Sequence, residues 1–149
     1  MSFLWLVGIF LIVVLGGGLC IGALTRPGEW YATLKKPWFS PPNWVFVPAW
    51  TLLYIMIALA GARSFARGPD IGFGVWLAQL ALNFVWSPIF FGLHRPRMAL
   101  AIVAALLAVI LVFIVLTWNA DRTSALLFFP YAAWVAFATL LNAAVVRLN

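Results

Sequence analysis

The stretch from Trp30 to Tyr54 reads WYATLKKPWFSPPNWVFVPAWTLLY and joins a proline-rich loop to an apolar helix. It holds four of the nine tryptophans, four of the nine prolines and both lysines of the chain. Prolines stiffen the backbone and restrict the residues before them, so this stretch is not a flexible linker. We expect whatever the protein recognises to be held by this stretch and by the helix faces that meet it.

The composition excludes an ordinary soluble protein. Of 149 residues, 66% are hydrophobic and 8% are charged, and the mean hydropathy is +1.12. So few polar groups cannot cover a water-facing surface. The chain is therefore expected to be an integral membrane protein surrounded by lipid.

Five apolar runs are each long enough to cross a bilayer as a helix, which takes about 20 residues. The connections between them are short, so they predict an all-α membrane protein with one five-helix bundle in a single domain, 1–149. The expected spans are 3–24, 44–62, 71–91, 98–118 and 125–146. Residues 25–43, between the first two spans, are called the lid loop below.

The basic residues predict the orientation in the membrane. In a five-helix arrangement, Arg26, Lys35, Lys36, Arg95, Arg97 and Arg147 lie on one side, and Arg63, Arg67 and Arg122 lie on the other. Six against three places the lid loop and the C-terminus in the cytoplasm and the N-terminus outside. Helical spans favour a bacterial inner membrane. The basic residues form no single basic face, which argues against a nucleic-acid partner.

The lid loop is expected to fold back over one end of the bundle. Its Trp30, Tyr31, Leu34, Trp38 and Phe39 are too apolar to stand in water, and a helical turn is expected near residues 29–35. The alternative is that these aromatic rings lie at headgroup level as an interfacial belt. A belt needs no prolines, whereas this loop contains Pro37, Pro41 and Pro42, which stiffen its backbone.

Two helix faces carry patterned side chains. Phe46, Trp50 and Tyr54 recur at four-residue spacing and form an aromatic face beneath the lid loop. In the next span Gln79, Asn83 and Ser87 recur at the same spacing, with Trp86 alongside, and must point into the bundle or a wet cavity. Such faces serve either as packing and interhelical hydrogen bonds or as the wall of a site.

The last span places Tyr131, Trp134, Ala138, Leu141 and Asn142 on one face, so it could enclose one aromatic pocket together with the second and third spans. Its early Pro130 predicts a slight kink near Leu126.

Gly18 and Gly22 are four residues apart in the first span, a spacing that serves close helix packing or thins the wall of a cavity. Cys20 is expected to be a small packing residue, and His94 a loop residue, with a haem-ligand role as the alternative for His94. One cysteine and one histidine cannot form a tetrahedral metal site, so no metal is expected.

Several motifs together resemble the translocator protein family, also called the peripheral-type benzodiazepine receptor or tryptophan-rich sensory protein family. They run in order through most of the chain and are Trp30-Tyr31, Leu34-Lys35-Lys36-Pro37-Trp38, Pro41-Pro42, Trp50, Leu53-Tyr54, Gln79 to Asn83, Trp86 to Gly92, Pro130-Tyr131, Trp134 and Phe137 to Thr139. The resemblance covers about residues 22–147. The tyrosine of the cholesterol-recognition pattern of animal members is absent from residues 141–147, so the resemblance does not extend to cholesterol binding by that route.

The resemblance implies a homodimeric five-helix bundle whose first loop closes a pocket for porphyrins and isoquinoline carboxamides. Carried over to this sequence, the pocket comprises Tyr31, Pro41, Trp50, Tyr54, Asn83, Trp86, Ser87, Trp134 and Ala138. The aromatic face described above adds Phe46 to this set. In some bacterial members the tryptophans that match Trp50 and Trp134 are associated with light-dependent breakdown of protoporphyrin.

The predicted function is therefore a membrane receptor for tetrapyrroles such as protoporphyrin IX, with no intrinsic cofactor. Trp50 and Trp134 are the only candidates for catalysis, by photo-oxidation, because the spans offer no carboxylate pair or Ser-His arrangement for hydrolysis. Arg26, Lys35 and Lys36 are candidates for contact with the porphyrin carboxylates, or they snorkel to headgroups. The alternatives are a transporter of tetrapyrroles or lipids and a stress- or oxygen-linked sensory regulator that acts through a partner protein.

Overall fold

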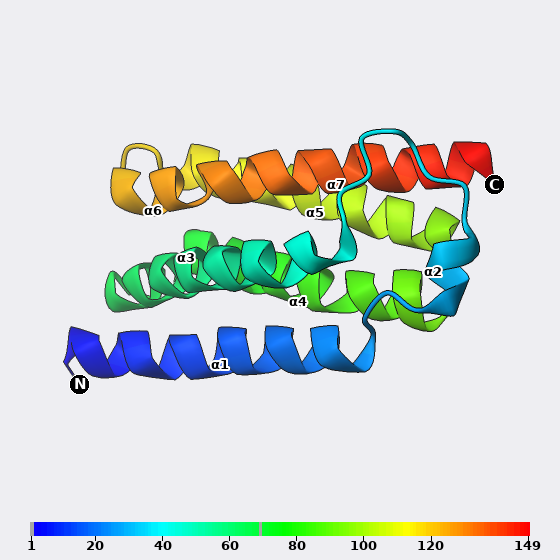
Figure 1. Cartoon of the computed structure of the whole chain (residues 1–149). Helices are drawn as coiled ribbons and strands as arrows, with labels where there is room; N and C mark the ends of the chain where they lie inside the picture. The colour runs from blue at the N-terminus through cyan, green and yellow to red at the C-terminus, as the bar shows by residue number, and fades with distance from the viewer. Residues whose placement is uncertain (1, 69) are drawn as a thin grey trace.

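The computed structural model describes residues 2–68 and 70–149 as a bundle of roughly parallel and antiparallel helices (Figure 1). In Figure 1, α1 lies on one side of the bundle, α5 and α7 lie on the opposite side, and α3 and α4 lie between them. The elements are α1 (Phe3–Leu24), α2 (Glu29–Thr33), the short helix η1 (Asn43–Val45), α3 (Phe46–Ala66), α4 (Ile71–Ser87), the π-helix η2 (Pro88–Gly92), α5 (Pro96–Thr117), α6 (Arg122–Leu127) and α7 (Phe129–Leu148).

Among the described residues, five helical segments are long and apolar enough to cross a membrane. They are Phe3–Leu24, Asn43–Ala66, Ile71–Gly92, Pro96–Thr117 and Arg122–Leu148. The prediction of five spans is confirmed, and the first span has the predicted bounds. The second span extends four residues beyond its predicted end at 62, because the helix continues through Arg63 and the buried Ser64 to Ala66.

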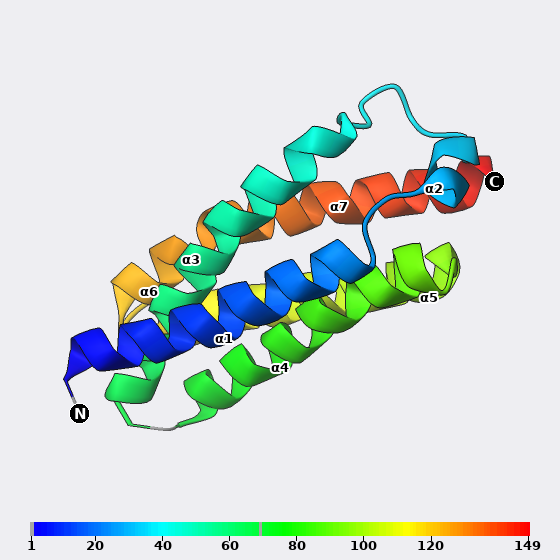
Figure 2. The same ribbon diagram turned by 60° about the horizontal axis from the view of Figure 1, so that its bottom comes forward.

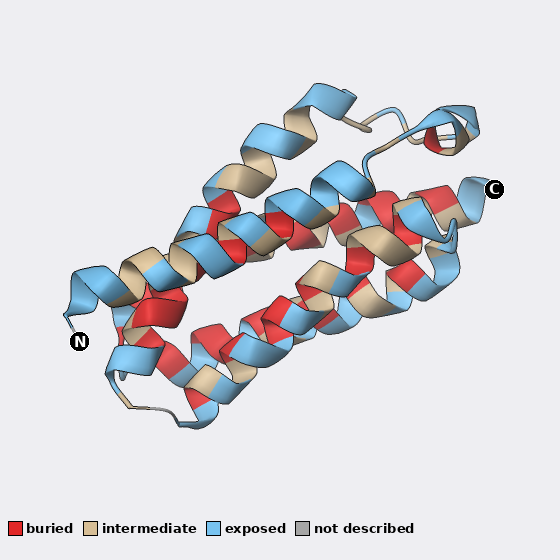
Figure 3. Ribbon diagram, turned by 90° about the horizontal axis from the view of Figure 1, so that it is seen from below, coloured by how far each residue is buried: buried red, intermediate tan, exposed pale blue. Residues whose placement is uncertain are grey.

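The buried residues lie between the helices, and the outer faces of the bundle are exposed. Figure 3 shows the buried residues on the faces that the helices turn toward one another, whereas α1 is largely exposed along its length. Only Val14 and Gly18 of α1 are buried. Because α1 packs mainly on α3 and makes fewer contacts with α4, it can form a thin outer wall beside them.

Two of the spans change geometry near a proline. Pro88 begins the π-helix η2, which closes with a wide turn from the Leu93 N–H to the Pro88 carbonyl at 2.8 Å. The last span breaks at Phe128 between α6 and α7, two residues before Pro130. This break confirms the kink that Pro130 predicts, since proline cannot donate to the carbonyl of Leu126.

The lid loop folds over the end of the bundle that also carries the α4–α5 turn and the C-terminus (Figures 1 and 2). It contains the predicted helical turn as α2, and Tyr31 is 2% exposed against Phe90 and Phe91. The expectation that Trp38 is also covered is wrong, because its side chain is 95% exposed. An exposed tryptophan at this level suits the interface between membrane and water.

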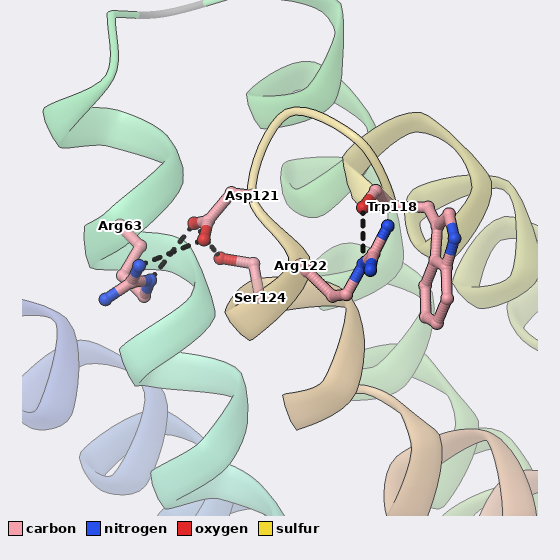
Figure 4. Close-up of polar contacts among 5 residues, drawn as sticks. All are labelled: Arg63, Trp118, Asp121, Arg122 and Ser124. Atoms are coloured by element: carbon pink, nitrogen blue, oxygen red, sulfur yellow. Dashed lines mark hydrogen bonds and ion pairs between the residues drawn. The ribbon is translucent and has the colours of Figure 1, made fainter.

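At the opposite end, an ion pair joins α3 to the turn before α6 (Figure 4). The Arg63 guanidinium donates from Nε and Nη2 to the two oxygens of Asp121, each at 3.0 Å, and Ser124 Oγ donates to Oδ2 at 2.6 Å. Burial acts to raise the pKa of Asp121, but the hydrogen bonds from Arg63 and Ser124 and the charges of Arg63 and Arg67 outweigh it. The pKa of Asp121 is therefore held below its usual value.

We expect Asp121→Asn to lower the free energy of unfolding at neutral pH by about 1 kcal/mol, because the charge that faces Arg63 is lost while Arg63 stays half-exposed. A carboxylate with a depressed native pKa stabilises the fold above its unfolded-state pKa and loses this contribution as the pH falls through its native pKa. Wild-type stability should thus fall on acidification, and the fall should be smaller in Asp121→Asn. Unfolding in detergent micelles as a function of pH checks this, with the exposed helix cap Asp70→Asn as control; equal acid sensitivity in wild type and Asp121→Asn would contradict it.

Candidate ligand-binding site

A cavity of about 570 Å³ lies between α1, α3 and α4, beside the start of the lid loop. A volume of this order is typical of small-molecule sites. Its wall is mostly apolar, with a few polar side chains, and is formed by Gly18, Leu19, Ile21, Gly22, Ala23, Thr25, Arg26, Pro27, Asn43, Trp44, Phe46, Val47, Trp50, Tyr54, Asn83, Trp86, Ser87 and Phe91.

The α1 side of the cavity is thin because it contains glycines. A Cβ atom at Gly18 would overlap the ring of Tyr54, whereas a Cβ at Gly22 would meet no described residue within 4 Å beyond its chain neighbours and its own helix backbone. Gly18 therefore allows close approach of α1 to α3, and Gly22 leaves open space at the cavity wall. Gly18 therefore serves close helix packing, and Gly22 thins the wall of the cavity, so each of the two expected roles is found at one position.

Aromatic rings from α3 and α4 form flat surfaces of the cavity. Trp50 and Tyr54, one turn apart on α3, are stacked with ring centroids 5.6 Å apart and planes at 27°. Trp86 is 8% exposed, and its Nε1 donates to Asn142 Oδ1 at 3.0 Å. Because this polar atom already has a partner on α7, Trp86 can offer the cavity an apolar ring surface.

Two polar side chains of α4, Asn83 and Ser87, lie one turn apart on the same wall. Asn83 Nδ2 donates to the Tyr131 hydroxyl at 2.7 Å, and Asn83 Oδ1 lies 3.5 Å from the Tyr54 hydroxyl. The Thr25 hydroxyl donates to the Ile21 carbonyl at 2.7 Å, so the Ser87 hydroxyl donates to Thr25 Oγ1 across its 2.7 Å contact. These bonds fix polar groups at defined points in an otherwise apolar wall.

The structure brings together six of the ten side chains predicted to bind ligand, namely Phe46, Trp50, Tyr54, Asn83, Trp86 and Ser87. Within the part of the chain that the structure describes, Tyr31, Pro41, Trp134 and Ala138 are not in the cavity wall. Trp134 lies behind Trp50, with ring centroids 6.2 Å apart and planes at 87°. Of the two tryptophans proposed for photo-oxidation, Trp50 alone therefore faces the cavity.

The predicted pocket used the last span as a wall, and the structure uses α1 in its place. The physical reason is that α7 packs closely on α5 and directs its polar groups into the bundle. Tyr131 is fully buried and bonds to Gln79 and Asn83, while Asn142 donates to the Pro96 carbonyl at 2.8 Å. The glycines of α1 leave space where α7 does not.

Sequence reasoning missed the α1 residues that line the cavity, such as Leu19, Ile21 and Thr25, and also Trp44 and Val47 of the second span. The available signal was the glycine pair, since a glycine-thinned helix beside an aromatic face predicts a cavity between them. The contact between Thr25 and Ser87 joins residues that are 62 positions apart, so no local sequence pattern predicts it.

The three cationic residues of the lid loop have different surroundings. Arg26 lines the cavity and is exposed. Lys36 Nζ donates to the carbonyls of Tyr31 at 2.7 Å and Leu34 at 3.3 Å and lies 4.6 Å from the centre of the Tyr31 ring. The Lys35 backbone forms two hydrogen bonds with the Asn149 side chain, at 3.1 and 2.9 Å. Arg26 is thus the candidate best placed to meet a ligand carboxylate.

Tyr31 acts in the lid loop as a buried anchor. Burial raises the pKa of its hydroxyl, and a hydrogen bond with Ser40 partly opposes the rise, so this group is neutral. Its neighbour Trp30 stacks on His94, with ring centroids 4.4 Å apart and planes at 7°. His94 therefore holds the lid loop against the α4–α5 turn. Among the described residues, no group of three or more candidate metal ligands occurs.

Comparison with known proteins shows the family to which this chain is related. The model of the TspO/MBR family matches residues 9–148, nearly the whole chain. The chain belongs to the TspO/MBR family. Relatives in this family come from bacteria, archaea, yeast and mammals.

Three relatives illustrate the range of the similarity. Protein CrtK of Rhodobacter capsulatus is 41% identical over 133 residues, which cover 86% of this chain and 83% of that protein. The tryptophan-rich sensory protein of Cereibacter sphaeroides is 38% identical over 146 residues, covering 97% and 92%. The human translocator protein is 34% identical over 141 residues, covering 89% and 83%. The resemblance inferred from the tryptophan and proline motifs is thereby confirmed.

Proposed function

We propose that this TspO/MBR family member binds flat, apolar carboxylate-bearing ligands of the tetrapyrrole class in the cavity between α1, α3 and α4. The observation that carries the proposal is the combination of stacked aromatic side chains with one cation at the wall. Trp50, Tyr54 and Trp86 offer ring surfaces, and Arg26 is exposed where α1 meets the lid loop.

The chemistry of a porphyrin matches these features. Its ring system is a wide apolar plate, which gains free energy by leaving water and by stacking on aromatic side chains. Its two carboxylates need cationic or polar partners, and a guanidinium binds a carboxylate through two parallel hydrogen bonds. With Arg26 at the end of the helix, the carboxylates can stay near the headgroups while the ring enters the apolar cavity.

The membrane setting supports access to such a ligand. Leu19 of α1, Trp44 of η1 and Val47 of α3 line the cavity and are exposed apolar side chains. A hydrophobic ligand dissolved in the bilayer can therefore meet the cavity wall without first crossing water. This arrangement suits a receptor for membrane-soluble pigments, with the lid-loop end directed to the cytoplasm.

We expect Trp50→Ala to weaken binding of protoporphyrin IX in the dark about fivefold, since it removes one aromatic surface of the cavity. Titration of the purified protein, followed by tryptophan quenching and the porphyrin absorption band, measures the dissociation constant. Trp118→Ala is the matched control, because Trp118 packs beneath Arg122 at the other end of the bundle. Absence of saturable binding by the wild type, or equal affinity of both variants, would reject the proposed site.

A further inference from the structure

A chain of three buried hydrogen bonds runs from the cavity into the middle of the bundle. Tyr54 OH donates to Asn83 Oδ1 at 3.5 Å, Asn83 Nδ2 donates to Tyr131 OH at 2.7 Å, and Tyr131 OH donates to Gln79 Oε1 at 2.7 Å. Tyr54 and Asn83 line the cavity. Among the described residues of its wall, neither Tyr131 nor Gln79 is found.

The inner end of the chain has an unused donor. Gln79 is fully buried, and its Nε2 has no hydrogen-bond partner within residues 2–68 and 70–149. A buried amide donor without a partner is costly, so its presence calls for a reason. The other amide atom, Oε1, is held by Tyr131.

Reversing every bond in the chain gives this donor a partner. Gln79 Nε2 would donate to Tyr131 OH, Tyr131 OH would donate to Asn83 Oδ1, and Asn83 Nδ2 would turn toward Tyr54 and the cavity. The two ends of an amide are similar in size, and a hydroxyl both donates and accepts, so the reversal needs only rotation of these groups. One Gln79 atom is left without a partner in either direction, so reversing the chain leaves the number of unpaired Gln79 atoms unchanged.

We propose that this chain is reversible and that Gln79 and Tyr131, from outside the cavity, let Asn83 present either its oxygen or its nitrogen to a ligand. This inference rests on the cavity being a ligand site, as proposed above. In the direction seen here the cavity wall offers an acceptor to N–H or O–H groups. In the opposite direction it offers a donor to carbonyl, ether or ring-nitrogen acceptors.

The proposal extends the ligand class. A rigid polar group inside a cavity would reject flat apolar molecules of the wrong polarity, because a buried donor or acceptor would be left unpaired. A reversible group accepts both kinds. The cavity should therefore select ligands by flatness and apolar area, while tolerating either hydrogen-bonding polarity at Asn83.

Replacing Gln79 by methionine removes the inner end of the chain. The Tyr131 proton then has Asn83 Oδ1 as its remaining acceptor in the chain, which fixes Asn83 Nδ2 toward the cavity. Gln79→Met should therefore keep its affinity for ligands that accept and lose affinity for ligands that only donate. A loss of about fivefold corresponds to one neutral hydrogen bond.

Two flat three-ring probes test this selectivity. Carbazole carries an N–H donor, and acridine carries a ring-nitrogen acceptor and is neutral at mildly alkaline pH. Their dissociation constants are measured by fluorescence for the wild type, Gln79→Met and the second variant Gln79→Leu. Thr117→Val is the control, because it removes a buried hydroxyl whose hydrogen bonds to described residues stay within α5, with the carbonyls of Phe113 and Ile114.

We expect wild type and Thr117→Val to bind both probes, and both Gln79 variants to keep acridine and weaken carbazole about fivefold. Wild-type binding of neither probe or of one alone, or equal changes for both probes in the Gln79 variants, overturns the proposal. Protoporphyrin IX titrated against the same wild-type preparation separates the two claims. Failure to bind protoporphyrin rejects the tetrapyrrole function, whereas the carbazole-to-acridine ratio reports on the chain alone.

Discussion

Replacing Gly61 by alanine is expected to lower the free energy of unfolding by about 2 kcal/mol, through overpacking between α3 and α4. A Cβ atom at this position would overlap the six-membered part of the Trp76 indole and lie 2.8 Å from Phe10 Cδ1. Trp76 cannot readily move away. Its Nε1 donates to the Ile57 carbonyl at 2.9 Å, and its ring stacks on Phe73 with planes at 9°.

Reversible unfolding in mixed detergent micelles measures this effect, with Gly74→Ala as the control. A Cβ at Gly74 would meet no described residue within 4 Å beyond its chain neighbours and its own helix backbone, so alanine there should be neutral or slightly stabilising through its better helix propensity. Since Gly61 is not part of the cavity wall as described, the folded fraction of Gly61→Ala should still bind protoporphyrin. Equal stability of the two glycine variants would show that Trp76 is free to shift.

The helices could be predicted because the bilayer imposes a simple rule on the sequence. Each span must satisfy its backbone internally over the thickness of the hydrocarbon core, so apolar length alone identifies it. The kink at Pro130 and the helical turn in the lid loop also follow from local chemistry. Trp38 was misjudged, because aromatic character alone does not separate a buried ring from one at the membrane interface.

The side chains of the candidate site were predicted where they share one helix face. Phe46, Trp50 and Tyr54, and likewise Asn83 and Ser87, recur every four residues and do line one cavity. Which helix closes the cavity was not predictable from spacing. That choice depends on whether Tyr131 and Asn142 find partners inside the bundle, and on how closely the glycines let α1 approach, and both are long-range contacts.

Gly18→Val is expected to reduce protoporphyrin binding by as much as about a hundredfold while leaving the fold nearly as stable as the wild type. A side chain at Gly18 meets the Tyr54 ring, as the Cβ position shows. Unlike Trp76, Tyr54 borders open space, and its hydroxyl donates to Asn83 over a long distance of 3.5 Å. The Tyr54 ring can therefore turn into the cavity, which relieves the strain. In this position the ring occupies space that the ligand needs. A misfit of roughly 1–3 kcal/mol in a packed site corresponds to a loss of up to about a hundredfold in affinity.

The comparison with Gly16→Val tests this mechanism, because Gly16 lies on the same helix and a Cβ there meets no described residue within 4 Å beyond its chain neighbours and its own helix backbone. Gly16→Val should bind protoporphyrin as the wild type does, and both variants should unfold at similar denaturant concentrations. If Gly18→Val binds normally, the ligand does not occupy the space beside Tyr54. If it loses binding and stability together, α1 has separated from α3, and the cavity is lost through the fold. Loss of binding in a stable protein is the result that places the ligand between the glycines of α1 and the aromatic face of α3.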